Sequence, residues 1–112
     1  EDPTYSYGTD LISTAEDYHR FCQLLLNKGY LNGKPFIKPE LLAELSKPIV
    51  GLDGEAIDFQ RGYAFALGVS VRVNDQKAEY KGSLGDYGWF GYFNTAFWID
   101  PQKQIVGIIL TQ

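Results

Sequence analysis

Two apolar runs near the end of the chain, residues 93–99 and 105–110, constrain the fold more than any other feature of the sequence. Apolar residues occupy nearly every position of both runs instead of every second one, which is typical of strands covered on both faces. The residues between them, 100–103, read Asp-Pro-Gln-Lys, with Asp and Pro in the first two positions of a type I turn. The sequence therefore predicts an antiparallel hairpin of two central strands.

Further strands are predicted upstream of this hairpin. Residues 63–73 alternate large and small side chains with a period of two, which predicts one long strand with a face of large residues. Another strand is expected through residues 87–92, within an aromatic segment punctuated by Gly88 and Gly91. Glycine at such positions lets the backbone approach a neighbour or a ligand closely.

A helix is predicted at about residues 14–28, ahead of the strands. Residues 13–16, Ser-Thr-Ala-Glu, have the form of a capping box, in which the Ser13 hydroxyl caps the helix and Glu16 reaches back to the cap. Apolar residues follow at steps of three and four, as on one face of an amphipathic helix.

A turn and a second helix come next. Asn32-Gly33 predicts a tight primed turn, and Pro39, at a first helical position, opens a shorter helix. The resulting order predicts an α+β fold, with two N-terminal helices followed by an antiparallel meander sheet of about four strands. We expect a single partial domain, with a helical portion at about residues 1–61 and a sheet portion at about 62–112.

Charge and composition exclude several classes of function. The net charge is −4, with acidic and basic residues interspersed, so no basic stripe is expected to bind nucleic acid. No apolar run approaches the length of a membrane span. Cys22 and His19 are the single residues of their types, which leaves no internal disulfide and no His-rich metal site. We expect Cys22 to be a buried apolar residue, and we expect no metal and no cofactor.

Three stretches, taken together, resemble the serine β-lactamase-like hydrolase family, which includes class C β-lactamases, penicillin-binding DD-peptidases and family VIII carboxylesterases. The likeness covers about residues 8–112 and corresponds to the C-terminal part of such enzymes. The stretches are residues 11–18 (Leu-Ile-Ser-Thr-Ala-Glu-Asp-Tyr), 29–34 (Gly-Tyr-Leu-Asn-Gly-Lys), and 87–91 (Tyr-Gly-Trp-Phe-Gly) with 97–101 (Phe-Trp-Ile-Asp-Pro).

The resemblance implies a fold in which a helical subdomain and a subdomain built on an antiparallel sheet face each other across an active-site cleft. In such proteins the nucleophile is the serine of a Ser-x-x-Lys motif, assisted by a Tyr-x-Asn motif upstream of the sheet. A third motif lies on the edge strand of the sheet as Lys-Thr-Gly, His-x-Gly or Trp-Gly-Gly. In this chain the third motif matches residues 89–91, Trp-Phe-Gly.

Roles for four residues follow from this match. The resemblance implies that Trp89 lines the cleft, that Gly91 lets the backbone approach the substrate, and that the backbone N–H of Tyr92 is one donor of an oxyanion hole. Phe90 stands where the family usually has a small residue, so it is expected to narrow the cleft and alter substrate fit. Trp89, Phe90 and Gly91 are therefore candidate substrate-binding residues, and the Tyr92 amide is the candidate catalytic group.

The chain departs from the family at the nucleophile. No Ser-x-x-Lys occurs, and a serine without an adjacent base is a weak nucleophile, so the chain is predicted to be inactive alone. The Tyr-x-Asn patterns at 30–32 and 92–94 lie in the wrong places for the family motif and are interpreted as coincidences. None of the five serines has a lysine three residues later. The residues at that position are Thr9, Glu16, Ile49, Val73 and Asp86, after Ser6, Ser13, Ser46, Ser70 and Ser83 respectively.

Two functions fit these observations. The chain is expected to be the C-terminal fragment of a serine hydrolase that cleaves an ester, amide or β-lactam through an acyl-enzyme. The alternative is a non-catalytic binding or interaction module on the same scaffold, with an aromatic patch at Trp89, Phe90 and Tyr92. The expected partners are a small-molecule substrate and either the missing N-terminal half or a second copy. Family members are often periplasmic or secreted, but residues 1–7 do not form a signal peptide, so the compartment stays open.

Overall fold

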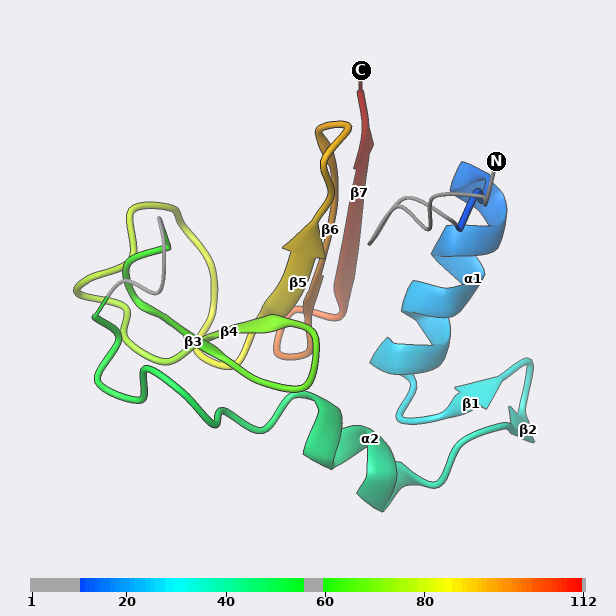
Figure 1. The fold of residues 1–112 in the computed structure, drawn as a ribbon. Helices are drawn as coiled ribbons and strands as arrows, with labels where there is room; N and C mark the ends of the chain where they lie inside the picture. Colours follow the sequence, from blue (N-terminus) through cyan, green and yellow to red (C-terminus); the bar gives the residue numbers. More distant parts are fainter. Residues whose placement is uncertain (1–10, 56–59, 112) are drawn as a thin grey trace, which may run out of the picture.

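A computed structural model describes residues 11–55 and 60–111 of the chain. It confirms the α+β prediction, because two helices are followed by a five-stranded antiparallel sheet in the order β3-β4-β5-β6-β7 (Figure 1). The helices are α1 (Ala15–Leu26) and α2 (Pro39–Leu45), and a small hairpin of β1 (Tyr30–Leu31) and β2 (Lys34–Pro35) lies between them. The sheet strands are β3 (Tyr63–Phe65), β4 (Ser70–Arg72), β5 (Tyr87–Phe90), β6 (Thr95–Asp100) and β7 (Ile105–Leu110).

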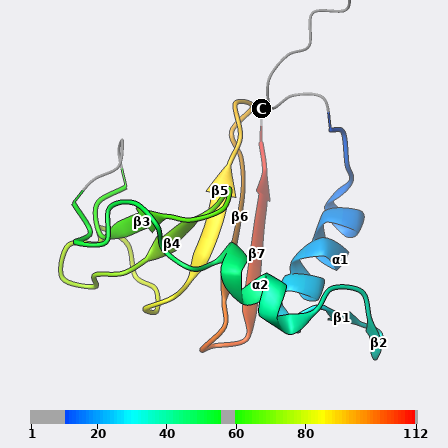
Figure 2. The ribbon, with the colours of Figure 1, turned by 60° about the horizontal axis from the view of Figure 1, so that its bottom comes forward.

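Helix α1 covers one face of the sheet and forms the core with it. Figures 1 and 2 both show α1 alongside β7, with β3 and β4 at the far end of the sheet. The apolar face of α1 meets buried side chains from the strands, and Cys22 is fully buried there, as predicted. The core residues are Cys22, Leu25, Leu26, Ala66, Val69, Val71, Tyr87 and Ile99.

The cap of α1 lies one residue later than the capping-box pattern predicts. Thr14, not Ser13, is the N-cap, and its hydroxyl accepts a hydrogen bond from the Asp17 amide at 3.1 Å. Glu16 does not reach back to the cap, because its carboxylate pairs with Arg20 one turn ahead at 2.6 Å. Both Ser13 and Thr14 are good caps by residue type, so the choice between them depends on where the backbone turns into the helix.

The prediction of one long strand over residues 63–73 is wrong. The chain reverses between β3 and β4, and Gly68 takes a positive φ of 81° in this turn. The reversal changes which side chains face the core: Ala64 is buried on β3, whereas Val71 is buried on β4. Large and small residues alternate along each strand of this hairpin separately. The sequence pattern therefore runs on through the turn without marking it.

The C-terminal hairpin forms as predicted in its strands and its turn. The Asp100 carboxylate accepts hydrogen bonds from the amides of Gln102 and Lys103, both at 3.0 Å, which fixes the turn between β6 and β7. β6 is a central strand, but β7 is the last strand of the sheet among the described residues. The prediction that both faces of these two strands are covered is wrong for the described residues. On the sheet face opposite α1, the side chains of Trp98 and Ile109 are nearly half exposed.

The remaining local predictions agree with the structure. Asn32 and Gly33 both take positive φ angles, 51° and 75°, in the primed turn that joins β1 to β2. Pro39 opens α2 at a first helical position. The division into a helical portion and a sheet portion near residue 61 stays a prediction. Neither helix in the described ranges is long and apolar enough to cross a membrane.

Candidate functional site

The hairpin between β5 and β6 carries the predicted site residues at its tip. The Gly91 amide donates to the Thr95 carbonyl at 2.7 Å, and the Asn94 amide donates back to the Gly91 carbonyl at 3.1 Å. Asn94 has a φ of 58°, in the left-handed region that asparagine tolerates better than most residues. This pattern is that of a three-residue loop, Tyr92 to Asn94, built on a type I turn followed by a left-handed residue.

Tyr92 stands at the tip with its backbone N–H outside this hydrogen-bond pattern. The amides on either side, of Gly91 and Asn94, are both used within the hairpin, whereas the Tyr92 amide donates to no acceptor among the described residues. The Tyr92 side chain is 87% exposed and meets the Phe93 ring edge-on, with ring centroids 5.4 Å apart. A main-chain donor with no acceptor among the described residues is therefore held in a defined turn.

The end of β7 supports the same tip. The hydroxyl of Thr111 donates to the Asn94 carbonyl at 2.7 Å. This bond joins the last residue of the loop to a strand that is not adjacent to β5 in the sheet. The loop is thus fixed from both β6 and the end of β7.

Trp89 and Phe90 lie where β5 passes the end of β4. The pairing of β4 with β5 consists of Ser70 with Gly88 and Val71 with Tyr87, so Trp89 is already beyond the last paired residue of β4. The rings of Trp89 and Phe90 are stacked, with centroids 5.0 Å apart and planes inclined by 16°. The Phe65 ring on β3 meets Trp89 edge-on at 5.3 Å. We call these three rings the aromatic stack.

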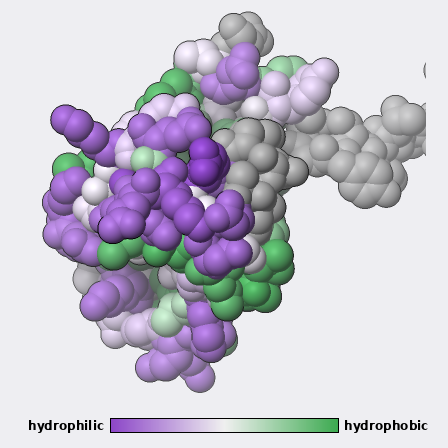
Figure 3. All heavy atoms as spheres, turned by 90° about the vertical axis from the view of Figure 1, so that its left-hand side faces the viewer, coloured by the Kyte–Doolittle hydropathy of each residue, from purple (hydrophilic) through white to green (hydrophobic). Residues whose placement is uncertain are grey.

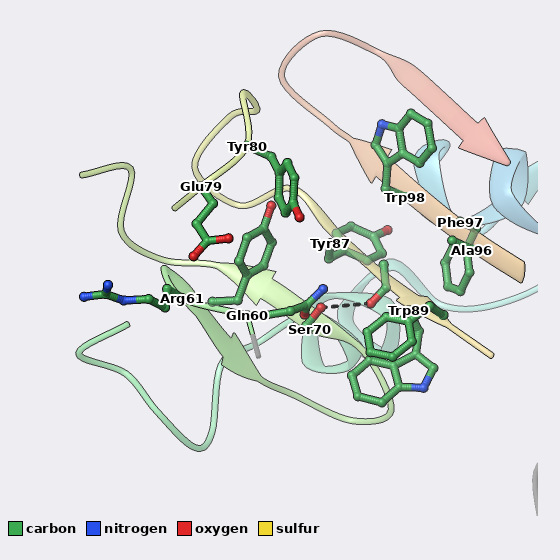
Figure 4. A pocket seen from close by; sticks show the side chains of 13 residues that line it. Gln60, Arg61, Ser70, Glu79, Tyr80, Tyr87, Trp89, Ala96, Phe97 and Trp98 are labelled. Atoms are coloured by element: carbon green, nitrogen blue, oxygen red, sulfur yellow. Dashed lines mark hydrogen bonds between the residues drawn. The ribbon is translucent and has the colours of Figure 1, made fainter. Parts of the chain in front are cut away.

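An open cavity of about 190 Å³ lies beside the aromatic stack (Figure 4). Its lining includes Gly88, which has no side chain, and Ala96, which has only a methyl group, so there is room above the sheet. The Ser70 hydroxyl donates to the Gly88 carbonyl at 3.3 Å. The full lining comprises Gln60, Arg61, Tyr63, Ser70, Glu79, Tyr80, Tyr87, Gly88, Trp89, Phe90, Ala96, Phe97 and Trp98.

A buried polar cluster holds the opposite end of β5. Asp86, directly before β5, accepts a hydrogen bond from the Ser83 amide at 3.1 Å, and the Ser83 hydroxyl donates to Asp100 at 2.7 Å. Arg72 donates to the Tyr80 carbonyl at 2.7 Å and pairs with Asp75. The cluster ties β4, β5 and β6 together at the end away from the hairpin tip.

The pKa values of the two buried carboxyl groups of this cluster, Asp86 and Asp100, are shifted in opposite directions. Burial raises the pKa of Asp86 above its usual range, and the Ser83 amide and the charge of Arg72 offset this only in part. Burial also acts to raise the pKa of Asp100, but the Ser83 hydroxyl and the amide and charge of Lys103 outweigh it and hold that pKa below its usual range. Asp100 is therefore stabilised as a carboxylate.

Two of the four candidate site residues line the cavity, and the other two lie outside its lining. Trp89 and Phe90 line the cavity, and Gly91 and Tyr92 follow them into the tip of the hairpin. Three contributions were not expected: the Phe65 ring, the Thr111 hydroxyl and the left-handed Asn94. Of these, only Asn94 carried a sequence signal, because asparagine is favoured at left-handed loop positions. No group of three or more His, Cys, Asp or Glu side chains within the described ranges is placed to hold a metal ion.

Comparison with known proteins decides the family. The family model described as Beta-lactamase matches residues 1–112, the whole chain. The chain belongs to the beta-lactamase family. Two relatives from Mycobacterium tuberculosis, "Protein Rv1367c" and "Uncharacterized protein MT1414", are each 28% identical to it over 113 aligned positions. The alignment covers 94% of this beta-lactamase-family chain but only 28% of each relative.

Family membership alone assigns no chemistry to the site. The family model covers all 112 residues, but it names no reaction and no substrate for this part of the fold. The chain spans less than a third of the length of the curated relatives it matches, and its 112 residues contain no Ser-x-x-Lys motif. The catalytic role of this part of the beta-lactamase fold is therefore a matter for proposal.

Proposed function

We propose that the chain forms one wall of an acyl-transfer site and supplies one of its oxyanion-hole donors, the backbone N–H of Tyr92. The substrate is an ester, an amide or a β-lactam, and the serine nucleophile belongs to polypeptide outside these 112 residues. Trp89 and Phe90 form the wall of the cleft, and Gly91 lets the substrate approach the main chain. By itself the chain is inactive.

The position of the Tyr92 amide carries this proposal. When a nucleophilic oxygen attacks a carbonyl carbon, the carbonyl oxygen becomes negatively charged, and fixed N–H donors stabilise that charge without reorganising. The Tyr92 amide donates to no acceptor among the described residues, and two turn hydrogen bonds and the Thr111 hydroxyl hold its loop. A donor fixed in this way supports the assignment of the Tyr92 amide to the oxyanion hole.

The turn at Tyr92 permits a direct test in the full-length gene product. Proline has no N–H, and its fixed φ suits the second position of a type I turn, where Tyr92 lies. We expect Tyr92→Pro to lower kcat for ester or β-lactam hydrolysis by about a hundredfold or more, as removal of one oxyanion donor does in other enzymes.

The matched control is Tyr92→Ala, which keeps the amide and should retain most of the activity. Equal activity of the proline and alanine variants, with both proteins folded, would exclude the Tyr92 amide from the oxyanion hole.

The isolated chain offers a second test. Incubation with nitrocefin, a fluorogenic ester and a fluorophosphonate probe should give no turnover and no labelled serine, because no serine has a lysine three residues later. Labelling of any serine in this chain would contradict the proposal that the nucleophile lies elsewhere.

A non-catalytic binding module is the second candidate function. It is supported by the exposure of aromatic side chains at the hairpin tip, where Tyr92 is 87% and Phe93 is 54% exposed. Such side chains suit the recognition of a sugar, a peptide or a partner protein. A Ser-x-x-Lys motif elsewhere in the full-length gene product would favour the enzyme, and its absence there would favour the binding module.

Exposed apolar residues on the sheet support a proposal about partners. Trp98, Ile105 and Ile109 lie between 43% and 48% exposed on the sheet face opposite α1. Hydrophobic residues also interrupt the hydrophilic surface seen from the β3–β4 side (Figure 3). We propose that further polypeptide of a longer protein covers the β7 part of this face, at Ile105 and Ile109, and that the isolated chain associates with itself there instead. Sedimentation at micromolar concentration should show oligomers, and a well-folded, strictly monomeric chain would contradict the proposal.

A further inference from the structure

We infer that the site selects substrates that carry a planar aromatic group, which lies in the cavity beside Phe90. The inference deepens the proposed function and rests on it for the reaction, although the binding itself requires no nucleophile.

The aromatic stack is arranged at one edge of β5. Successive side chains on a strand point to opposite faces, so rings at adjacent positions do not normally meet. The rings of Trp89 and Phe90 are nevertheless stacked with centroids 5.0 Å apart, which requires both to turn toward the edge that β5 presents beyond β4. Phe65 holds Trp89 from the side at 5.3 Å. The rings are thus ordered before any ligand binds, which lowers the entropic cost of binding.

The cavity next to the stack has the shape and character for a flat apolar group. Gly88 and Ala96 form a floor of small residues, while Phe90 and Trp98 provide aromatic surface on its lining. Gly88 could not be replaced by a larger residue, because a Cβ there would come within 2.1 Å of the Phe97 carbonyl oxygen. The floor therefore carries no side chain at Gly88 and only a methyl group at Ala96, which leaves its backbone open to the face of a planar ring.

Charge does not favour an ionic ligand at this site. Arg61 and Glu79, both on the cavity lining, carry opposite charges and lie at exposed positions. Aromatic pairs gain stability beyond the area that they bury when they stack with an offset or meet edge-on. A neutral aromatic group therefore gains more here than a saturated group of equal size.

The isolated chain and a matched pair of probes test this inference. The probes are 2-naphthol and decahydro-2-naphthol, which share the hydroxyl group and the carbon skeleton and differ in planarity and aromaticity. We expect the chain to bind 2-naphthol about two- to tenfold more tightly, the range that one aromatic contact supplies. Chemical-shift changes should be largest at the Trp89 indole N–H and the Phe90 ring. Equal affinity for the two probes, or shifts confined to other parts of the chain, would overturn the inference.

Two phenylalanine-to-leucine variants identify the ring that causes the preference for 2-naphthol. Phe90→Leu keeps an apolar side chain but removes the ring, so the preference for 2-naphthol should fall toward unity. Phe93→Leu makes the same change at a half-exposed ring outside the cavity and should keep the preference. Loss of the preference in both variants would show that the effect is not local to Phe90. The wild-type ratio decides the inference even where a variant fails to fold.

The binding test and the activity test fail independently. Selective binding without an effect of Tyr92→Pro on hydrolysis would leave an aromatic binding site and remove the acyl-transfer role. An effect of Tyr92→Pro without selectivity for 2-naphthol would keep the acyl-transfer role and remove the aromatic binding site.

Discussion

The indole ring of Trp98 lies across the backbone of Gly107, so closely that a Cβ at Gly107 would come within 2.0 Å of the ring atom Cζ2. The two residues are partners in the β6–β7 ladder, and Trp98 is also the partner of Gly88 in β5. A large side chain on the central strand thus has a glycine beside it on each neighbouring strand. The absence of a side chain at Gly107 is what lets the ring lie flat on the sheet.

Gly107→Ala should destabilise the chain. The added methyl group would displace the Trp98 ring, and such overpacking typically lowers the free energy of unfolding by about 1–3 kcal/mol. Urea denaturation of the wild type and the variant measures the effect. In the Trp98→Ala background the ring is gone, so the same Gly107→Ala change should cost far less. Equal costs in the two backgrounds would show that the ring and the glycine are not coupled.

The Ser83 hydroxyl should contribute stability that depends on pH. It donates to the buried Asp100 carboxylate at 2.7 Å and helps to hold the pKa of Asp100 below its usual range. A lowered pKa in the folded state gives stability that is present above the unfolded pKa, near 4, and is lost as the pH falls through the folded pKa. We expect Ser83→Ala to lower the free energy of unfolding by about 2 kcal/mol at pH 7.

The same substitution should matter less in acid. As the pH falls through the folded pKa of Asp100, the hydroxyl no longer stabilises a charge, so the difference between Ser83→Ala and wild type should shrink. The raised pKa of Asp86 has the opposite effect on the pH dependence, but it is common to both proteins and cancels in the difference. Ser13→Ala, at an exposed residue, is the control and should show no such change with pH. A Ser83→Ala effect that stays constant after Asp100 has become protonated in the folded protein, as followed by the NMR shift of its carboxyl carbon, would contradict the role of Asp100.

The left-handed backbone at Asn94 gives a third prediction. Its φ of 58° suits glycine, tolerates asparagine and disfavours residues with an ordinary Cβ. Asn94→Gly should leave the thermal unfolding midpoint nearly unchanged, whereas Asn94→Ala should cost about 1 kcal/mol. The bond from Thr111 is made to the Asn94 backbone carbonyl and persists in both variants. Equal effects of glycine and alanine would mean that the loop relaxes to another conformation.

Local signals in the sequence were enough to predict most of the elements. The period of three to four residues gave α1, Asn32-Gly33 gave the primed turn, and Asp100 gave the last hairpin turn. The long strand over residues 63–73 was predicted wrongly, because a hairpin of two alternating strands has the same period as one continuous strand. Only the pairing between β3 and β4 distinguishes the two.

The residues of the candidate site were likewise predicted only in part. Trp89, Phe90, Gly91 and Tyr92 were identified from the motif that they resemble, since they are consecutive in the sequence. Phe65 and Thr111 were missed, because each reaches the site from a different strand and neither belongs to a motif.

By itself, the sequence determined the α+β class, the family resemblance and the residues of the candidate site, because these depend on short-range periodicity and on residues that are adjacent in the chain. Tertiary structure alone decided that the rings of Trp89 and Phe90 stack at the edge of β5, that Trp98 lies on Gly107, and that Ser83 joins Asp86 to Asp100. The contacts of Trp98 and Ser83 depend on the register of the strands. The stacking of Trp89 on Phe90 depends on where β4 ends beside β5. Register follows from turn geometry together with the packing of the strands, so no single local pattern specifies it.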